Sequence, residues 1–174
     1  TWGEVQLGAL LEQILAPEQY QTNVATKPKS SERVEFAICL PGRDADSPVF
    51  LPIDAKFPSE DYQRLVDAQE RADVAGVEEA GKALDNRLKI EAKTIRDKYV
   101  SPPDTTDFAV MYLPTEGLYA EALRRPQLAE FLQREYRITI AGPTTLAAML
   151  NSLQMGFRTL AIEKRSSEVW QVLG

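Results

Sequence analysis

The chain has 174 residues, of which 44% are hydrophobic and 26% charged, values typical of a globular protein and not of a disordered or fibrous one. Its net charge of -6 at pH 7 argues against a broad nucleic-acid-binding surface. It has no histidine and a single cysteine, Cys39, which excludes a histidine metal site, a Ser-His-Asp triad and an intrachain disulfide. Chemistry must therefore rest on carboxylates, lysine or hydroxyl groups.

The first predicted element is a helix over residues 2–16, where apolar residues recur at helical spacing until Pro17. A short strand is predicted at 20–26, and a polar turn follows it.

Two alternating segments, 33–40 and 49–56, predict an antiparallel hairpin, because the polar stretch 41–48 between them is rich in turn-forming residues. A register in which partner numbers sum to 89 places the apolar pairs on one face. These pairs are Phe36 with Ile53, Ile38 with Leu51, and Leu40 with Val49. The other face then carries Glu35 opposite Asp54, with Lys56 two residues further on.

The rest of the chain, from residue 59 onward, is predicted to contain further helices and strands. Residues 59–99 are rich in helix-forming residues and predict one long helix or two, interrupted near Gly76 or Gly81. A buried strand is predicted at 107–114, and two helices, a short strand and a further helix follow it. These last elements are predicted at 116–124, 126–135, 137–141 and from 144 onward.

The ionisable groups on the polar face of the hairpin suit phosphodiester hydrolysis. Glu35 and Asp54 can ligate a divalent cation, and Lys56 can orient or activate water and contact a phosphate. A cross-strand ion pair on a solvated sheet face explains the same residues without chemistry. Like charges directly opposite one another destabilise a sheet by roughly 0.2 to 1 kcal/mol, which favours a bound cation.

Each of the other polar candidates has both a structural and a functional interpretation. Glu4 begins the first helix, where the helix dipole alone favours a carboxylate. Thr144 and Thr145 are typical of a helix cap, although a helix N-terminus also binds phosphate. A basic cluster, which either faces solvent or contacts DNA, is formed by Lys93, Arg96 and Lys98.

Five short motifs occur in order along the chain. They are WGE at 2–4, VEFAICLPG from Val34, PIDAKFP from Pro52, MYLPTEG from Met111 and AGPTTL from Ala141. Their order and spacing resemble the RmuC family of bacterial DNA-recombination proteins over nearly the whole chain. The resemblance implies a PD-(D/E)XK nuclease-like core, DNA cleavage as the activity, and limitation of DNA rearrangement as the process.

The resemblance also implies roles for single residues. Asp54-Ala55-Lys56 looks like the (D/E)XK element, and Glu35 stands in the place of the first aspartate of the motif. Here Val34-Glu35 replaces the usual proline and aspartate, and the extra methylene of glutamate changes its reach. Glu4 looks like the helix-borne acidic residue that completes such a site. The implied cofactor is Mg²⁺ or Mn²⁺, held by Asp54, Glu35 and Glu4 beside Lys56.

We therefore expect a single α/β domain over 1–174 with a restriction-endonuclease-like, PD-(D/E)XK core, in which helices flank a mixed central sheet. Its expected parts are the core hairpin 33–56, a long helical insertion at 59–99 and a second half at 107–174.

The expected function is metal-dependent DNA hydrolysis by a deoxyribonuclease. One alternative is a catalytically inactive nuclease fold that binds DNA structures or partner proteins as a scaffold, and another is a plain interaction domain. We expect DNA as the partner, a cytoplasmic location and no membrane contact from this segment, and we leave a homo-oligomer open. The resemblance implies that a membrane anchor would lie in a segment absent here.

Overall fold

A five-stranded mixed sheet forms the centre of the computed structural model, which describes residues 1–42 and 47–173. The order of the strands in the sheet follows the sequence: β1 (Tyr20–Val24), β2 (Val34–Leu40), β3 (Val49–Ala55), β4 (Ala109–Tyr112) and β5 (Ile138–Ala141). Strands β1, β2 and β3 pair in antiparallel fashion, whereas β3, β4 and β5 are parallel. The predicted mixed α/β architecture is thus confirmed.

The hairpin between β2 and β3 has the predicted register. Its outermost pairs are Phe36 with Ile53 and Leu40 with Val49, so partner numbers sum to 89. Buried Phe36, Ile38, Leu51 and Ile53 belong to one hydrophobic cluster, as alternation requires. The predicted turn at 41–48 lies partly outside the described residues, because 43–46 are not among them.

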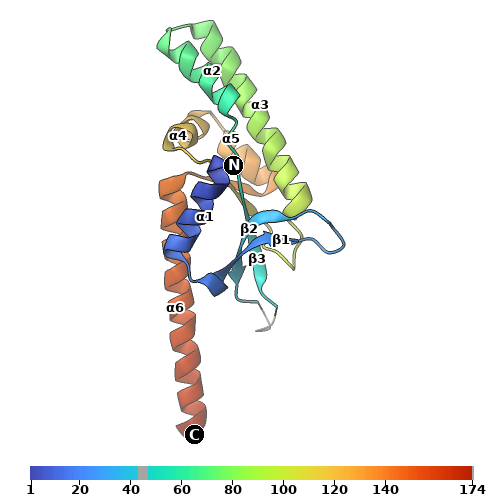
Figure 1. Ribbon diagram of the computed structural model, residues 1–174, viewed down its shortest axis with the longest axis vertical. Helices are drawn as coiled ribbons and strands as arrows, with labels where there is room; N and C mark the ends of the chain where they lie inside the picture. The colour runs from blue at the N-terminus through green and yellow to red at the C-terminus, as the bar shows by residue number, and fades with distance from the viewer. Residues whose placement is uncertain (43–46, 174) are drawn as a thin grey trace.

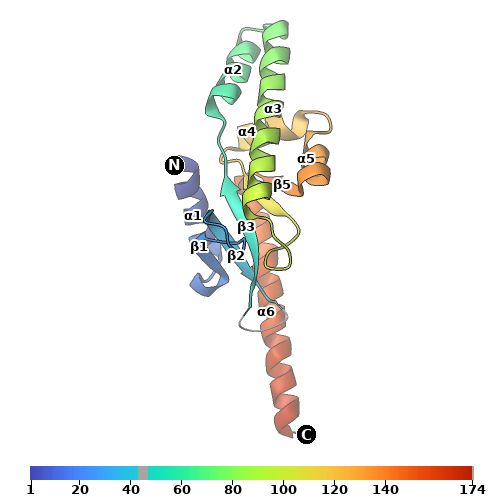
Figure 2. The same ribbon diagram turned by 90° about the vertical axis from the view of Figure 1, so that its right-hand side faces the viewer.

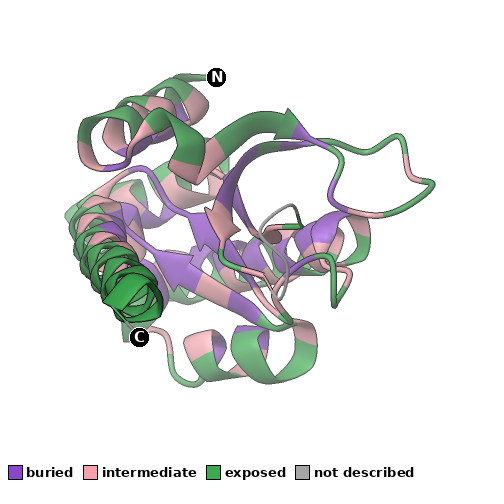
Figure 3. Ribbon diagram, turned by 90° about the horizontal axis from the view of Figure 1, so that it is seen from below, coloured by how far each residue is buried: buried purple, intermediate pink, exposed green. Residues whose placement is uncertain are grey.

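Helices cover both faces of the sheet (Figures 1 and 3). On one face, α1 (Trp2–Ile14) and α6 (Pro143–Leu173) contribute Leu7, Leu11, Leu146 and Leu150 to the cluster that contains Phe36. The second cluster lies on the other face, under α3 (Val74–Tyr99), α4 (Glu116–Arg124) and α5 (Leu128–Tyr136). A 3-10 turn, η1 (Pro17–Gln19), joins α1 to β1. The buried apolar residues of these helices face the sheet.

The predicted helical stretch is a hairpin of two helices, α2 (Ser59–Glu70) and α3, which projects from the sheet (Figure 2). The break falls at residues 71–73, just before Gly76 in the first turn of α3, whereas Gly81 lies further along α3. Asp73 is the N-cap that starts α3: its side chain accepts a hydrogen bond of 3.0 Å from the Gly76 amide. At the opposite end of the molecule, α6 extends well beyond the sheet (Figure 2).

The carboxyl ends of the three parallel strands meet at one edge of the sheet, where the first turns of α1, α4 and α6 also lie (Figure 1). Gly3 lets α1 approach this edge: a Cβ atom at this position would lie 3.0 Å from Pro114 Cγ and 3.6 Å from Ala55 Cβ. Ligands of open α/β sheets bind at such edges. Within the described residues, no helix is both long and apolar enough to cross a membrane.

Candidate active site at the carboxyl edge of the parallel strands

Asp54, near the end of β3, is the most deeply buried ionisable residue of the predicted site. Its side chain is 9% exposed. The Nζ atom of Lys56 lies 3.1 Å from Asp54 Oδ2, so the two side chains form an ion pair. The structure therefore brings Asp54 and Lys56 together, as the sequence predicted.

Helix α3 adds two charged residues to this pair. Glu91 Oε2 lies 3.5 Å from Lys56 Nζ. Arg87, one helical turn earlier, lies 3.9 Å from Glu91 and 3.5 Å from Asp61 of α2. Residues four positions apart share one face of a helix, so the packing of α3 on the sheet points Arg87 and Glu91 toward Lys56 together.

Burial and neighbouring charges shift the pKa values of the central pair in the same direction for different reasons. Burial raises the pKa of Asp54, the charges of Glu4 and Glu91 add to this rise, and Lys56 opposes it only in part. Burial disfavours the charged form of Lys56, but the ion pairs with Asp54 and Glu91 outweigh that effect and raise the pKa of Lys56. Asp54 is thus a costly buried charge, and Lys56 a firmly protonated cation.

Glu4 reaches this site from α1. The Thr1 backbone nitrogen donates to Glu4 Oε2 over 3.2 Å, and the Glu4 amide donates to Thr1 Oγ1 over 3.2 Å, so a capping box holds the first turn. The Glu4 carboxylate serves as a helix cap and also acts on the pKa of Asp54.

Glu35 does not form the predicted cross-strand pair with Asp54. It is exposed, and the ladder of β2 and β3 ends at the pair of Phe36 with Ile53, so no pairing of Glu35 with Asp54 is formed. Burial first, and then the charge of Asp54, raises the pKa of Tyr99; Lys56 opposes this rise, and Glu32 and Glu35 add to it. Among the described residues, no three carboxylate or cysteine side chains are placed as a ready metal cluster.

A pocket of about 330 Å³ opens beside Lys56. Its lining is mostly charged and polar and includes Lys56, Phe57, Ser59, Asp61, Arg87 and Glu91. The donor set suits a hard cation, because Mg²⁺ commonly uses one or two carboxylates and retains several waters. Asp54 is the buried carboxylate of this site, and the charges of Glu4 and Glu91 act on its pKa.

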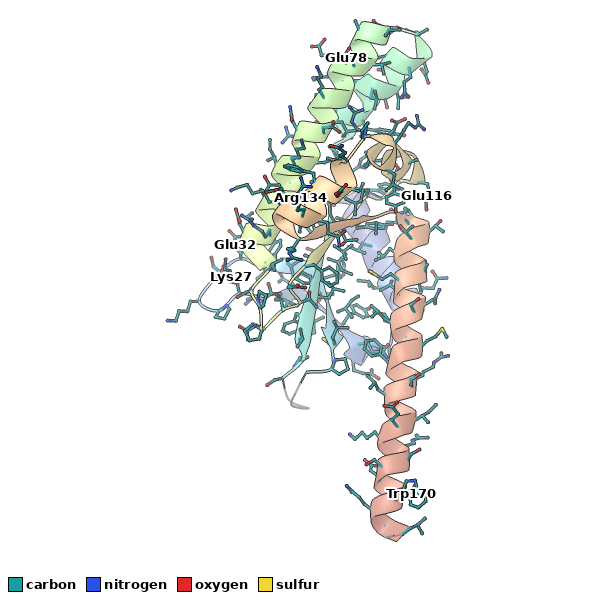
Figure 4. All side chains as sticks on the ribbon, turned by 180° about the vertical axis from the view of Figure 1, so that it is seen from behind. Lys27, Glu32, Glu78, Glu116, Arg134 and Trp170 are labelled. Atoms are coloured by element: carbon teal, nitrogen blue, oxygen red, sulfur yellow. The ribbon has the colours of Figure 1, made fainter. Side chains whose placement is uncertain are left out.

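The N-terminus of α6 already holds a carboxylate. The backbone amide of Thr144 donates to Glu116 Oε1 over 2.6 Å, and Figure 4 shows Glu116 beside the start of α6. The Thr145 hydroxyl accepts from the Gly142 amide at 2.8 Å. Thr145 thus caps the start of α6. The Glu116 carboxylate accepts the hydrogen bond that the Thr144 amide would otherwise donate to a bound phosphate.

The predicted basic cluster on α3 is exposed but paired. Lys93 and Arg96 lie 3.0 Å and 2.8 Å from Asp97, and Lys98 lies 3.7 Å from Glu32. These contacts are between exposed side chains, and such pairs contribute little to stability and exchange readily for other partners.

The family model named RmuC family matches residues 1–174. The chain belongs to the RmuC family. It is 64% identical over 175 residues to proteins of two strains of Xylella fastidiosa, each named DNA recombination protein RmuC homolog, with 100% of the chain aligned. The homolog of the same name from Chlamydia trachomatis is 29% identical over 98% of the chain. The chain spans 38% of the length of these relatives. No solved structure matches it significantly.

Three residues of this RmuC site were missed by reasoning from the sequence. Glu91, Arg87 and Asp61 all come from the helical hairpin that follows β3. The spacing of Arg87 and Glu91 was visible, but such a pair at four-residue spacing is typical of a solvated helix face. Only the packing of α3 shows that this face meets Lys56.

Proposed function

We propose that this part of the RmuC-family protein hydrolyses DNA phosphodiester bonds with Mg²⁺ or Mn²⁺ as cofactor. The observation that carries the proposal is the buried Asp54 carboxylate, which is ion-paired with Lys56 over 3.1 Å and has a raised pKa. A buried carboxylate with a perturbed pKa beside a charged pocket is typical of an active site.

The order of elements supports the PD-(D/E)XK assignment. A helix, an antiparallel three-stranded meander, a helical crossover and a parallel strand follow one another from α1 to β4. Asp54-Ala55-Lys56 stands at the end of β3, where the resemblance expects the (D/E)XK element.

The residues present fit a divalent cation held by Asp54 with Glu4 or Glu91. When bound, such a cation would activate water and neutralise charge on the phosphate. Because its pKa is raised, Lys56 remains protonated near neutral pH and is suited to bind a phosphate oxygen and orient water, not to act as a base. Arg87 stands on the same pocket and supplies a second cation toward the DNA backbone.

The DNA path is proposed to run over the seam between α3 and α5. Residues 87–98 and 124–137 together carry nine Lys and Arg against four Asp and Glu, a net charge of +5 in a chain of net charge -6. Lys89 lies 4.4 Å from the ring centroid of Phe131, and Arg96 lies 5.2 Å from that of Tyr136. Figure 4 places Arg134 on α5 in this region. Clustered cations suit a phosphate backbone.

The test is cleavage of linear and branched DNA with added Mg²⁺ or Mn²⁺. We expect Asp54→Asn and Lys56→Ala each to lose at least 100-fold in rate, with an unchanged circular dichroism spectrum. Lys82→Ala is the matched control, because Lys82 is an exposed lysine of α3, paired only with Glu78 over 3.4 Å. Cleavage at the original rate by either site variant would overturn the proposal.

A scaffold without catalysis is the second candidate. It is favoured by the absence of a three-carboxylate cluster within residues 1–42 and 47–173. DNA binding that no divalent cation strengthens, together with no cleavage by the unsubstituted chain, would select the scaffold.

A further inference from the structure

Two large aromatic side chains stand exposed at the candidate site. Trp2 is 56% exposed and Phe57 is 39% exposed. Their ring centroids lie 5.8 Å apart, with 47° between the ring planes. Single exposed apolar residues are common on proteins, but these two meet from α1 and from the segment after β3. The pair is therefore a product of the tertiary fold.

Phe57 connects this aromatic pair to the pocket. Phe57 directly follows Lys56 and lines the same pocket. Trp2 stands two residues before Glu4, and Gly3 between them packs against Ala55 at the end of β3. An aromatic surface and the charged site thus share one edge of the sheet.

The chemistry of this edge suits a nucleotide. An aromatic ring offers a stacking face for any base, and the adjacent cations Lys56 and Arg87 offer contacts to its phosphate. An apolar peptide would use the aromatic rings but not these cations. Within a duplex the faces of each base are covered by its neighbours, so only an unpaired base can stack here.

We infer that Trp2 and Phe57 form a stacking platform for an unpaired nucleobase, so that the site selects DNA with single-stranded character. The inference rests on the proposed function, because it takes DNA as the ligand. The rings are too close and too tilted to hold a base between them. The base therefore stacks on the outer face of Trp2, the more exposed ring, and Phe57 supports Trp2 from behind.

Tryptophan fluorescence gives a direct test, because the chain has two tryptophans. The other one, Trp170, is 73% exposed and lies near the far end of α6 (Figure 4). In a Trp170→Phe background, all tryptophan emission comes from Trp2. Titration in EDTA with a thymidine oligonucleotide should quench this emission, and titration with a relaxed, covalently closed duplex circle should not. Quenching of equal size by both would overturn the inference.

Affinities supply the second readout. Stacking on one base is worth roughly 1 to 3 kcal/mol, which corresponds to a roughly 5- to 150-fold change in affinity. Trp2→Ala should weaken oligonucleotide binding by that factor and change duplex binding by less than about twofold. Trp2→Phe should retain most of the affinity, and Trp170→Ala is the matched control. An unchanged oligonucleotide affinity for Trp2→Ala overturns the platform.

The two proposals fail in different ways. Since binding is measured in EDTA, the platform does not depend on cleavage. Metal-dependent cleavage with no effect of Trp2→Ala on the preference for single strands would leave the nuclease proposal intact and remove the platform. Tight, Trp2-dependent binding of single strands without any cleavage would do the reverse.

Discussion

Lys56, directly after β3, and Glu91 of α3 are joined by an ion pair of 3.5 Å between Nζ and Oε2, although 35 positions separate them in the chain. The same ammonium lies 3.1 Å from Asp54. One lysine therefore links the strand that carries the candidate site to the helix that covers it, and replacement of either carboxylate changes the environment of both elements.

The two outer carboxylates should differ in importance. We expect Glu91→Gln to lower the rate of metal-dependent DNA cleavage at least tenfold, because the Glu91 carboxylate contacts Lys56 and its charge raises the pKa of Asp54. Glu35→Gln should lower the rate less than threefold, because Glu35 is exposed and unpaired with Asp54. Steady-state rates on one DNA substrate measure both. The reverse order would show that the first motif position ligates the cation after all.

Metal binding should stabilise the chain through Asp54. A divalent cation that binds only the folded state at 100 times its dissociation constant adds about 2.7 kcal/mol to the free energy of unfolding. Thermal unfolding with and without Mg²⁺ should therefore show a rise in Tm for the unsubstituted chain and none for Asp54→Asn. Glu12→Gln, which removes an exposed carboxylate of α1, is the control. An equal rise in Asp54→Asn would place the cation elsewhere.

The pH dependence of the metal-free chain follows from the same carboxylate. Because the pKa of Asp54 is raised from 3.8, the folded state holds this proton more tightly than the unfolded state does. The contribution of Asp54 to stability is thus greatest in acid and declines as pH rises through its folded pKa. Asp54→Asn should therefore stabilise the metal-free chain at pH 7, as measured by urea unfolding.

Tyr112 should limit stability in alkali. Burial, with the charge of Glu116 adding to it, raises the pKa of Tyr112 to about 12, so the folded state keeps a proton that the unfolded chain loses near pH 10. Stability should fall between pH 10 and 12 by up to roughly 1.4 kcal/mol per pH unit. Tyr112→Phe should remove that slope.

At pH 7 the same substitution should add about 1 kcal/mol of stability, because the Tyr112 hydroxyl is buried without a hydrogen-bond partner. Guanidinium unfolding at pH 7 and pH 11 measures both effects, with Tyr20→Phe as the control. A loss of stability at pH 7 would mean that the hydroxyl has a partner in solution.

The hairpin register could be predicted from the sequence because side chains alternate strictly along a strand, and a slip by one residue would expose Phe36 and Ile53. The pairing of Asp54 with Lys56 followed from the same alternation. The position of Glu35 did not, because alternation gives the face of a residue and not the point at which the ladder ends. Glu91 could not be found at all, since the contact depends on how α3 packs against the sheet.

The charge along the α2–α3 hairpin limits the directions from which DNA can approach. Residues 59–86 carry eight Asp and Glu against three Lys and Arg, whereas 87–98 carry two against five. A phosphate backbone that followed α3 outward would meet an increasingly negative potential beyond Arg87. In the proposed DNA complex we therefore expect a bound strand to leave the helix at that point and cross the sheet edge toward Trp2, with the projecting hairpin as an electrostatic boundary.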